Sequence, residues 1–309
     1  LEFARRNMKI IAPFGLVAAL LSAATGHSSA VDVAKNQPMK LAAMEALYDA
    51  GASTPEGKTA DGKGLPLGMV GVLNPSKGRP DDGKASHLFS VEAPRLLSYM
   101  VDDRYVPGVN NILEGGYHKP DGSVALSTEE MMRRGRIAID ALNAFRSARK
   151  AGDSIGAAQH RAVLEENFPY YGYGYFTSKY ETIPNIPLTY YSFRVMVGLG
   201  SAFLLLFLIL TWYAYKRNEK LASTRWLIWA SIILTPLAWV ASEAGWVVAE
   251  VGRQPWTIQN LLPVHAAISK IEASSVMITF ALFFLLFTIM LVAEINIMRK
   301  AIKQGPDQH

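Results

Sequence analysis

Two carboxylates, an indole and a guanidinium stand close together where one long apolar run of the chain ends. On a helix that turns 100° per residue, these side chains fall within roughly a third of the circumference. Ionisable groups at a depth where hydrocarbon gives way to water are costly, so each of them needs a partner. They therefore either neutralise one another as a structural network or hold a group that is not protein. The residues are Glu243, Trp246, Glu250 and Arg253.

A second candidate site opens an earlier apolar run and contains Arg194, Met196, Gly198 and Gly200. A methionine in an apolar helix is ordinarily core filling. Beside an arginine and two glycines that permit the close approach of a flat group, Met196 is also a candidate thioether ligand for haem iron, with Arg194 facing a propionate. The residue types alone leave both interpretations open.

The third candidate pair, Lys40 and Glu45, lies in the stretch 37–48, where Pro38 suits the start of a helix. The two residues are five positions apart, which is too far round a helix for an ideal ion pair. Spacing alone therefore favours a solvated amphipathic helix in which neither side chain has a chemical role.

Composition limits the classes of protein and of metal site. Of the 309 residues, 50% are hydrophobic and 18% are charged, which fits membrane spans combined with a sizeable polar region. The chain has no cysteine, which excludes disulfides, thiolate metal sites, iron–sulfur clusters and c-type haem attachment. The net charge of +5 comes from basic residues beside apolar runs and not from a separate arm, so it indicates membrane flanks and no nucleic-acid partner.

Four apolar runs must position these candidates. The first run, from Ile10 to Ala24, follows Arg5, Arg6 and Lys9. Read from Met8, it resembles a secretory signal peptide, whereas the residues ahead of Met8 favour a transmembrane helix. The expected segments are a helix with a basic start (1–24), an external loop region (25–188), two transmembrane helices (189–217 and 218–250), an external loop (251–273), and a last transmembrane helix with its tail (274–309).

Basic residues set the expected orientation of these spans. They mark the start of the first run, the link between the second and third, and the end of the fourth. By the positive-inside rule these places lie in the cytoplasm, and the long polar region lies outside. Met196 and Glu250 then lie at a similar depth near the outer surface. The fold class is an all-α membrane protein with about four transmembrane helices and a large external loop domain.

Inside the external region, the pattern predicts a helix over 128–151 and an extended piece with a helical turn over 86–101. The Gly- and Pro-rich segment 51–83 is predicted to be a mobile loop. Tyrosines crowd the segment 168–191. Such a cluster suits either the membrane interface or base stacking, and the apolar run that follows favours the interface.

Three motifs, in the same order, resemble subunit I of the cytochrome bd quinol oxidases. They are Gly245 to Trp256, Phe193 to Gly200 and Gln37 to Glu45. The resemblance extends from Phe3 to Lys303, although residues 51–168 are matched only loosely. It implies that the chain is a partial helix bundle of a larger subunit and that 25–188 is a quinol-binding loop region.

The resemblance also implies roles for individual residues. Met196 would be an axial ligand of a low-spin haem b iron, with Arg194 helping to set its potential. Glu250 would ligate or lie beside a high-spin haem, Arg253 would support a propionate or that carboxylate, and Trp246 would lie between haems. The implied cofactors are a low-spin haem b, a high-spin haem b and haem d.

Lys40 and Glu45 match the positions linked to quinol oxidation, which reverses the interpretation from spacing. Glu45 would accept a quinol proton. The family's histidine ligands would precede Leu1, since no histidine here stands in a matching context; the six are His27, His87, His118, His160, His265 and His309. The chain is therefore expected to hold half of each haem site and to be inactive alone.

The implied activity is that of a respiratory quinol:oxygen oxidoreductase in the bacterial inner membrane. Quinol would be oxidised at the outer face, electrons would pass through haems b and d, and dioxygen would be reduced to water. Subunit II and small accessory subunits are the implied partners. The alternative is a non-enzymatic secreted or membrane-anchored binding or assembly protein with a signal peptide and a three-span anchor.

Overall fold

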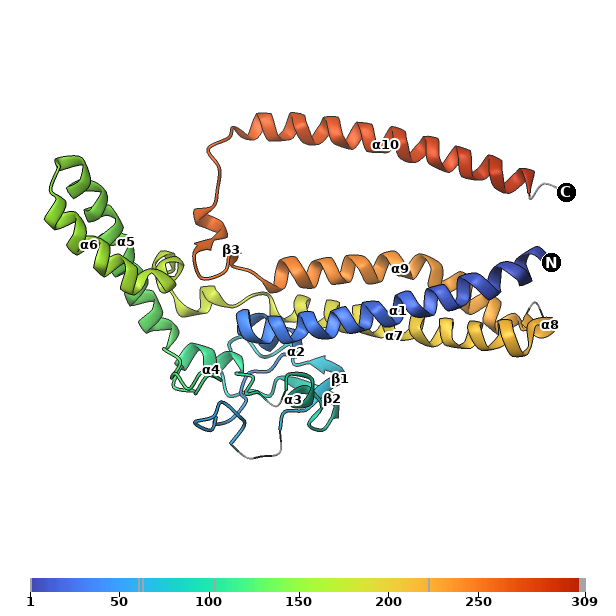
Figure 1. The fold of residues 1–309 in the computed structure, drawn as a ribbon, viewed down its shortest axis with the longest axis horizontal. Coiled ribbons are helices and arrows are strands. Elements are labelled where there is room, and N and C mark those ends of the chain that lie inside the picture. The colour runs from blue at the N-terminus through green and yellow to red at the C-terminus, as the bar shows by residue number, and fades with distance from the viewer. Residues whose placement is uncertain (1, 61, 63, 103, 222, 306–309) are drawn as a thin grey trace. The chain divides into compact units, whose positions relative to one another are not determined.

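The computed structural model of the chain describes residues 2–60, 62, 64–102, 104–221 and 223–305 (Figure 1). His309 and the end of the expected tail, 306–309, lie outside the described residues. The chain divides into two compact units, Leu1–Ala266 and Ala267–His309, which are described separately.

Within the described residues, four helices are long and apolar enough to cross a membrane, which confirms the expected fold class. They are α1 (Glu2–Asn36), α7 (Ile186–Lys216), α9 (Arg225–Gly252) and α10 (Ala273–Gln304). Helix α1 continues past the end of its apolar run at Ala24. The hydroxyls of Thr25 and Ser28 bond back to carbonyls one turn earlier, at 3.0 and 3.4 Å, which satisfies these polar groups within the helix.

In the first unit, α7 packs against both α1 and α9 (Figure 1). Gly15 of α1 lies directly against the ring of Phe207, where a Cβ would collide with the ring carbons. Leu206 and Leu210 of α7 are buried in the same cluster as Ala12 of α1. The absence of a side chain at Gly15 thus lets α1 and α7 approach closely.

A small α/β region lies against the start of α7. It consists of α2 (Pro38–Glu45), β1 (Leu67–Leu73), β2 (His87–Ala93), α3 (Leu96–Met100) and α4 (Val109–Glu114). Strands β1 and β2 pair antiparallel. The extended piece and helical turn predicted over 86–101 are therefore confirmed.

The loop predicted over 51–83 was wrong for β1 and for the turn that follows it. The Asp82 carboxylate accepts hydrogen bonds from Lys77 Nζ at 2.9 Å and from the backbone N–H groups of Gly78 and Lys84 at 2.9 and 3.0 Å. These bonds join both sides of the turn, and β2 supplies the backbone partners of β1. The hydrogen bonds of Asp82 do not depend on apolar residues, so composition did not indicate the turn. Strand β1 is itself largely apolar, and the polar composition of the whole segment 51–83 obscured it.

The helix predicted over 128–151 has the same bounds in the structure. Helix α5 (Thr128–Ala151) starts where the Ser127 hydroxyl accepts a hydrogen bond from Glu130 N at 3.2 Å. It ends at Gly152, whose φ of 76° suits glycine. Further short elements follow: α6 (Ser154–Asn167), η1 (Phe168–Tyr175), η2 (Lys179–Thr182), α8 (Asn218–Leu221), β3 (Trp256–Ile258), β4 (Leu262–Pro263) and η3 (Val264–Ala266).

The tyrosine-rich turn η1 is held between α5 and the residues after α9. The Tyr173 ring lies 4.9 Å from the Trp256 ring, centroid to centroid. Gly135 of α5 lies against the backbone of Gly174, where neither residue leaves room for a Cβ. The placement of these tyrosines at a membrane interface stays a prediction.

Replacing Gly135 with alanine is expected to destabilise the contact between α5 and η1 by about 1–3 kcal/mol, because the new methyl group would collide with backbone that cannot rotate away. Hydrogen–deuterium exchange of amides in 128–175 should show faster exchange. Gly78→Ala is the matched control, since a Cβ at Gly78 meets open space. Equal protection in both variants would contradict the packing described here.

The second unit consists largely of α10. Pairs of phenylalanines one turn apart stack along its surface, Phe280 with Phe284 at 6.4 Å and Phe283 with Phe287 at 6.1 Å between centroids. This apolar surface matches the transmembrane helix that the sequence predicted for this segment.

Candidate functional site

Glu45 and Arg194 form a buried ion pair between α2 and α7. Arg194 Nη2 lies 2.8 Å from Glu45 Oε2, and the two side chains are 13% and 4% exposed. The guanidinium also donates to the carbonyl oxygens of Met44 and Gly68, the latter at 2.9 Å. Burial raises the pKa of the Glu45 carboxyl, and Arg194 opposes that rise. The pair thus places a carboxylate of raised proton affinity beside a fixed positive charge.

Neighbouring elements fix the orientation of Arg194. Tyr190 lies one turn earlier on α7, and its ring centroid is 3.9 Å from the guanidinium carbon. A Cβ at Gly68 of β1 would lie 2.8 Å from Arg194 Nη2, so glycine is what lets the strand reach the guanidinium. The ion pair is therefore held by α2, α7 and β1 together.

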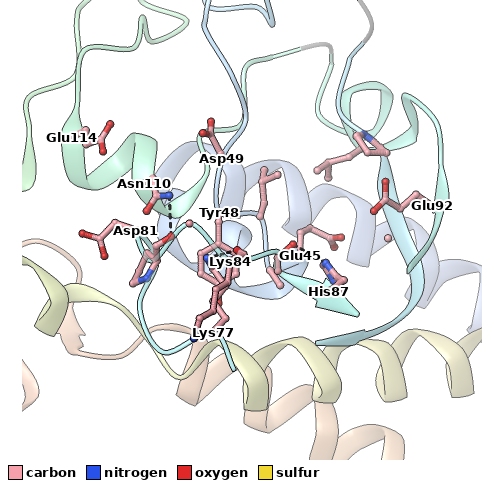
Figure 2. A pocket seen from close by; sticks show the side chains of 18 residues that line it. Glu45, Tyr48, Asp49, Lys77, Asp81, Lys84, His87, Glu92, Asn110 and Glu114 are labelled. Atoms are coloured by element: carbon pink, nitrogen blue, oxygen red, sulfur yellow. Dashed lines mark hydrogen bonds between the residues drawn. The ribbon is translucent and has the colours of Figure 1, made fainter. Parts of the chain in front are cut away.

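A cavity of about 540 Å³ opens beside this pair (Figure 2). Its walls come from α2, both strands, the turn between them and α4, and include Glu45, Tyr48, Lys77, His87 and Asn110. Lys77 Nζ lies 4.4 Å from the centroid of the Tyr48 ring and 2.9 Å from Asp82 Oδ1, so it joins the turn to the segment that follows α2. The cavity combines apolar wall with a proton-accepting carboxylate, which suits a ring that carries hydroxyl groups.

Lys40 points to a different place from Glu45, namely the end of α9. Its Nζ donates to the carbonyl oxygen of Ala249 at 3.4 Å, and its Cγ lies 3.1 Å from the position of a Cβ at Gly252. Burial and then Arg253 lower the pKa of Lys40, whereas Glu250 raises it. Positions five apart are about 140° apart on a helix, so α2 presents the two predicted quinol residues to two different partners.

Glu250 and Arg253 pair with each other at the end of α9. Arg253 Nη2 lies 2.6 Å from Glu250 Oε2, with the side chains 42% and 38% exposed. Arg253 Nε is buried and has no hydrogen-bond partner among the described residues. The sequence left open whether these charged groups neutralise one another or hold a group that is not protein. Glu250 and Arg253 do neutralise each other, while the unpartnered Arg253 Nε can still donate to another group.

Met196 of α7 faces Gly245 of α9, whereas the neighbouring Trp246 is exposed. Met196 Sδ is 3.0 Å from the position of a Cβ at Gly245, and the Trp246 residue is 63% exposed. A Cβ at Gly198 or Gly200 would meet no atom within 4 Å. The Met196 thioether and the orphaned Arg253 Nε are groups of the kinds that can hold a haem, a soft iron ligand and a hydrogen-bond donor.

Glu243 is exposed on α9, and it has no ion-pair partner among the described residues. Among those residues no cluster of three His, Asp or Glu side chains forms a metal-binding group. The structure thus separates the residues predicted from the opening motif: Glu250 pairs with Arg253 and lies near Lys40, while Trp246 and Glu243 point outward.

Sequence analysis missed two residues of the site, Tyr190 and His87. Tyr190 precedes Arg194 by four positions, and the i,i+4 spacing of an aromatic ring and an arginine was a usable signal. His87 stands at the start of the extended piece that the sequence predicted, but no sequence pattern connected it with Glu45.

Comparisons with known proteins show the family to which the sequence is similar. Residues 1–306 match the family model described as cytochrome bd terminal oxidase subunit I. The chain is 30% identical to cytochrome bd-II ubiquinol oxidase subunit 1 of Escherichia coli (strain K12), over 98% of this chain and 56% of that protein. It is 25% identical to cytochrome bd ubiquinol oxidase subunit 1 of Bacillus subtilis (strain 168), over 99% of this chain and 50% of that protein. The chain spans about half the length of the curated relatives it matches.

Proposed function

Because the chain belongs to the cytochrome bd terminal oxidase subunit I family, we propose that it is part of a respiratory quinol oxidase. The complete enzyme would oxidise quinol at the outer face of the bacterial inner membrane and reduce dioxygen to water, contributing to the proton motive force. Subunit II and small accessory subunits would complete it. The observation that carries this proposal is the buried Glu45–Arg194 pair, whose carboxylate lines a cavity of about 540 Å³.

Glu45 is the proposed acceptor of a quinol proton. Proton transfer needs a carboxylate within hydrogen-bond reach of the hydroxyl, in its ionised state. Arg194 supplies that state, since its guanidinium stabilises the buried carboxylate. Burial works in the opposite direction and favours the protonated form. The balance of the two lets Glu45 bind a proton and release it again.

The haem groups would be held by residues of α7 and α9. Met196 would ligate the iron of the low-spin haem b, and Glu250 would bind or lie beside a high-spin haem. Arg253 would support a propionate or the Glu250 carboxylate, with which it already pairs, and Trp246 would lie between haems. When bound, the haems would supply one-electron transfer from quinol to dioxygen.

Arg194 acquires a second role beside the one that the resemblance implied. Its guanidinium already pairs with Glu45, and only its Nε is buried without a partner among the described residues. Arg194 would therefore hold Glu45 at the quinol site with its terminal nitrogens. Because it lies only two positions before Met196 on α7, it would also stay close to the haem that Met196 would bind.

The test is to express the complete subunit with its partner subunit and to record reduced-minus-oxidised absorbance together with quinol-dependent oxygen consumption. Signals of low-spin haem b, high-spin haem b and haem d with quinol turnover support the proposal. A complex that forms without haem and without turnover would instead support the non-enzymatic binding or assembly protein.

Replacing Lys40 with alanine is expected to raise the quinol KM about fivefold in the complete oxidase. The lysine anchors α2 to the end of α9, and loss of this weak charged hydrogen bond, worth about 1 kcal/mol, lets Glu45 shift. Steady-state oxygen consumption at varied quinol checks this. Lys35→Ala, at the exposed end of α1, is the control, and an unchanged KM in Lys40→Ala would return Lys40 to a purely solvated role.

A further inference from the structure

His87, the first residue of β2, lies on the wall of the same cavity as Glu45 (Figure 2). The residue is half-buried, and its Nδ1 lies 2.9 Å from the Ser86 hydroxyl. In the tautomer in which Nδ1 donates to that hydroxyl, Nε2 carries the free lone pair. An imidazole and a carboxylate thus line one cavity from two different elements.

The His87 ring is fixed by β1 and α7. Gly71 of β1 has no side chain, and a Cβ there would lie 3.0 Å from His87 Cδ2. On α7, the Tyr190 ring centroid is 5.3 Å from that of His87 and 3.9 Å from the Arg194 guanidinium. The same tyrosine therefore packs against both the histidine and the arginine that holds Glu45.

The charges around His87 favour its neutral form. Burial lowers the pKa of the imidazole, Arg194 lowers it further, and Glu92 opposes them. A neutral imidazole at neutral pH can accept a proton. The titratable and charged groups that face it or share its cavity are Glu45, Tyr48 and Asp49 of the α2 side, Lys77, Asp81 and Lys84 of the turn, Glu92 of β2, Glu114 of α4, and Tyr190 and Arg194 of α7.

Quinol oxidation requires more proton-accepting capacity than one carboxylate provides. Each quinol that becomes a quinone loses two electrons and two protons, and Glu45 can take only one proton before it must release it. A second acceptor on the same cavity would let both O–H bonds break without the first proton leaving.

We propose that His87 is the second proton acceptor of this cavity, a catalytic residue for quinol oxidation. This inference rests on the proposed function. One hydroxyl proton would go to the Glu45 carboxylate and the other to His87 Nε2, while the two electrons would leave one at a time for the one-electron haem acceptors of the complete oxidase. The quinone leaves, and both protons pass to the outer water.

The experiment compares His87→Gln with wild type in the complete oxidase, over a range of pH and at saturating quinol. Both acceptors must be deprotonated, so on the acid side log kcat of the wild type should rise with a slope approaching two per pH unit. His87→Gln should lower kcat about tenfold near neutral pH, since water can take the second proton less efficiently, and should reduce the slope to one.

His118→Gln is the matched control, because His118 lies beside a different cavity of the same external region. A wild-type slope of one, or a His87→Gln enzyme with the wild-type slope and kcat, overturns the inference. If His87→Gln fails to assemble, the wild-type slope of log kcat against pH still tests whether a second acceptor is needed. Ser86→Ala, which removes the partner of His87 Nδ1, should then shift the acid side of the pH profile of kcat.

Failure of the proposed function looks different from failure of this inference. If the wild-type complex shows haem signals but no quinol-dependent oxygen consumption, the proposed function fails. If the wild type turns over, Glu45→Gln is slow and His87→Gln is normal, only the role of His87 fails. A one-electron reductant that releases no proton should drive His87→Gln and wild type at the same rate, whereas a slower variant would show a structural defect and overturn the proton role.

Discussion

Replacing Met196 with leucine is expected to remove the low-spin haem b signal of the complete oxidase, and quinol-driven oxygen consumption with it. Leucine and methionine have similar volumes, so the exchange should cost less than about 1.5 kcal/mol of stability and leave α7 packed against Gly245. Only the thioether, a soft ligand for haem iron, is lost. Reduced-minus-oxidised absorbance of the purified complex provides the measurement.

The control for this change is Met277→Leu on α10, where the methionine is 70% exposed. It should leave all haem signals as they are in the wild type. A low-spin haem b signal that persists in Met196→Leu would show that the iron ligand is elsewhere, and Met196 would return to its ordinary role as packing between α7 and α9.

Replacing Glu45 with glutamine is expected to lower quinol turnover at least about 100-fold, the lower limit for removal of a general base. Glutamine keeps the shape of the side chain and can still accept a hydrogen bond from Arg194, but it cannot take up a proton. It also leaves the buried guanidinium without its counter-charge, at a local cost of about 3 kcal/mol. Oxygen consumption at saturating quinol measures the loss.

Glu130→Gln is the matched control for Glu45→Gln. Glu130 is likewise ion-paired, at 2.6 Å from Arg133 Nη2, but it lies on α5 away from the cavity. Haem spectra should be intact in both variants, which separates lost chemistry from lost assembly. Normal turnover in Glu45→Gln, with every quinol tested, would remove Glu45 from the proton path.

The sequence predicted the helices whose bounds depend on interactions between residues close together in the chain. Helix α5 has its predicted bounds because its cap at Ser127 and its glycine at position 152 act on neighbouring residues. The four spans follow from runs of apolar residues, and the helix from Pro38 follows from proline's fixed backbone angle.

The partner of Arg194 did not follow from the sequence. Glu45 is 149 positions away along the chain, and only the packing of α2 against α7 brings the two together. Residue types suggested a haem propionate for Arg194 because Met196 and two glycines stand beside it on the same helix, whereas its carboxylate partner in the structure comes from α2. The five-residue spacing of Lys40 and Glu45 indicated that they point to different sides of the helix. The family resemblance assigns both residues to quinol oxidation and does not by itself indicate this separation.

Helix α2 connects two of the membrane-spanning helices, α7 and α9. Glu45 joins one of its sides to α7 through the ion pair with Arg194, and Lys40 joins the other to α9 through a hydrogen bond. Ala42 and Ala43 are fully buried between these contacts. A helix of eight residues has little stability of its own, so it stays folded through these attachments. Loosening either contact is therefore expected to shift α2, and with it the cavity wall and its contact with the end of α9.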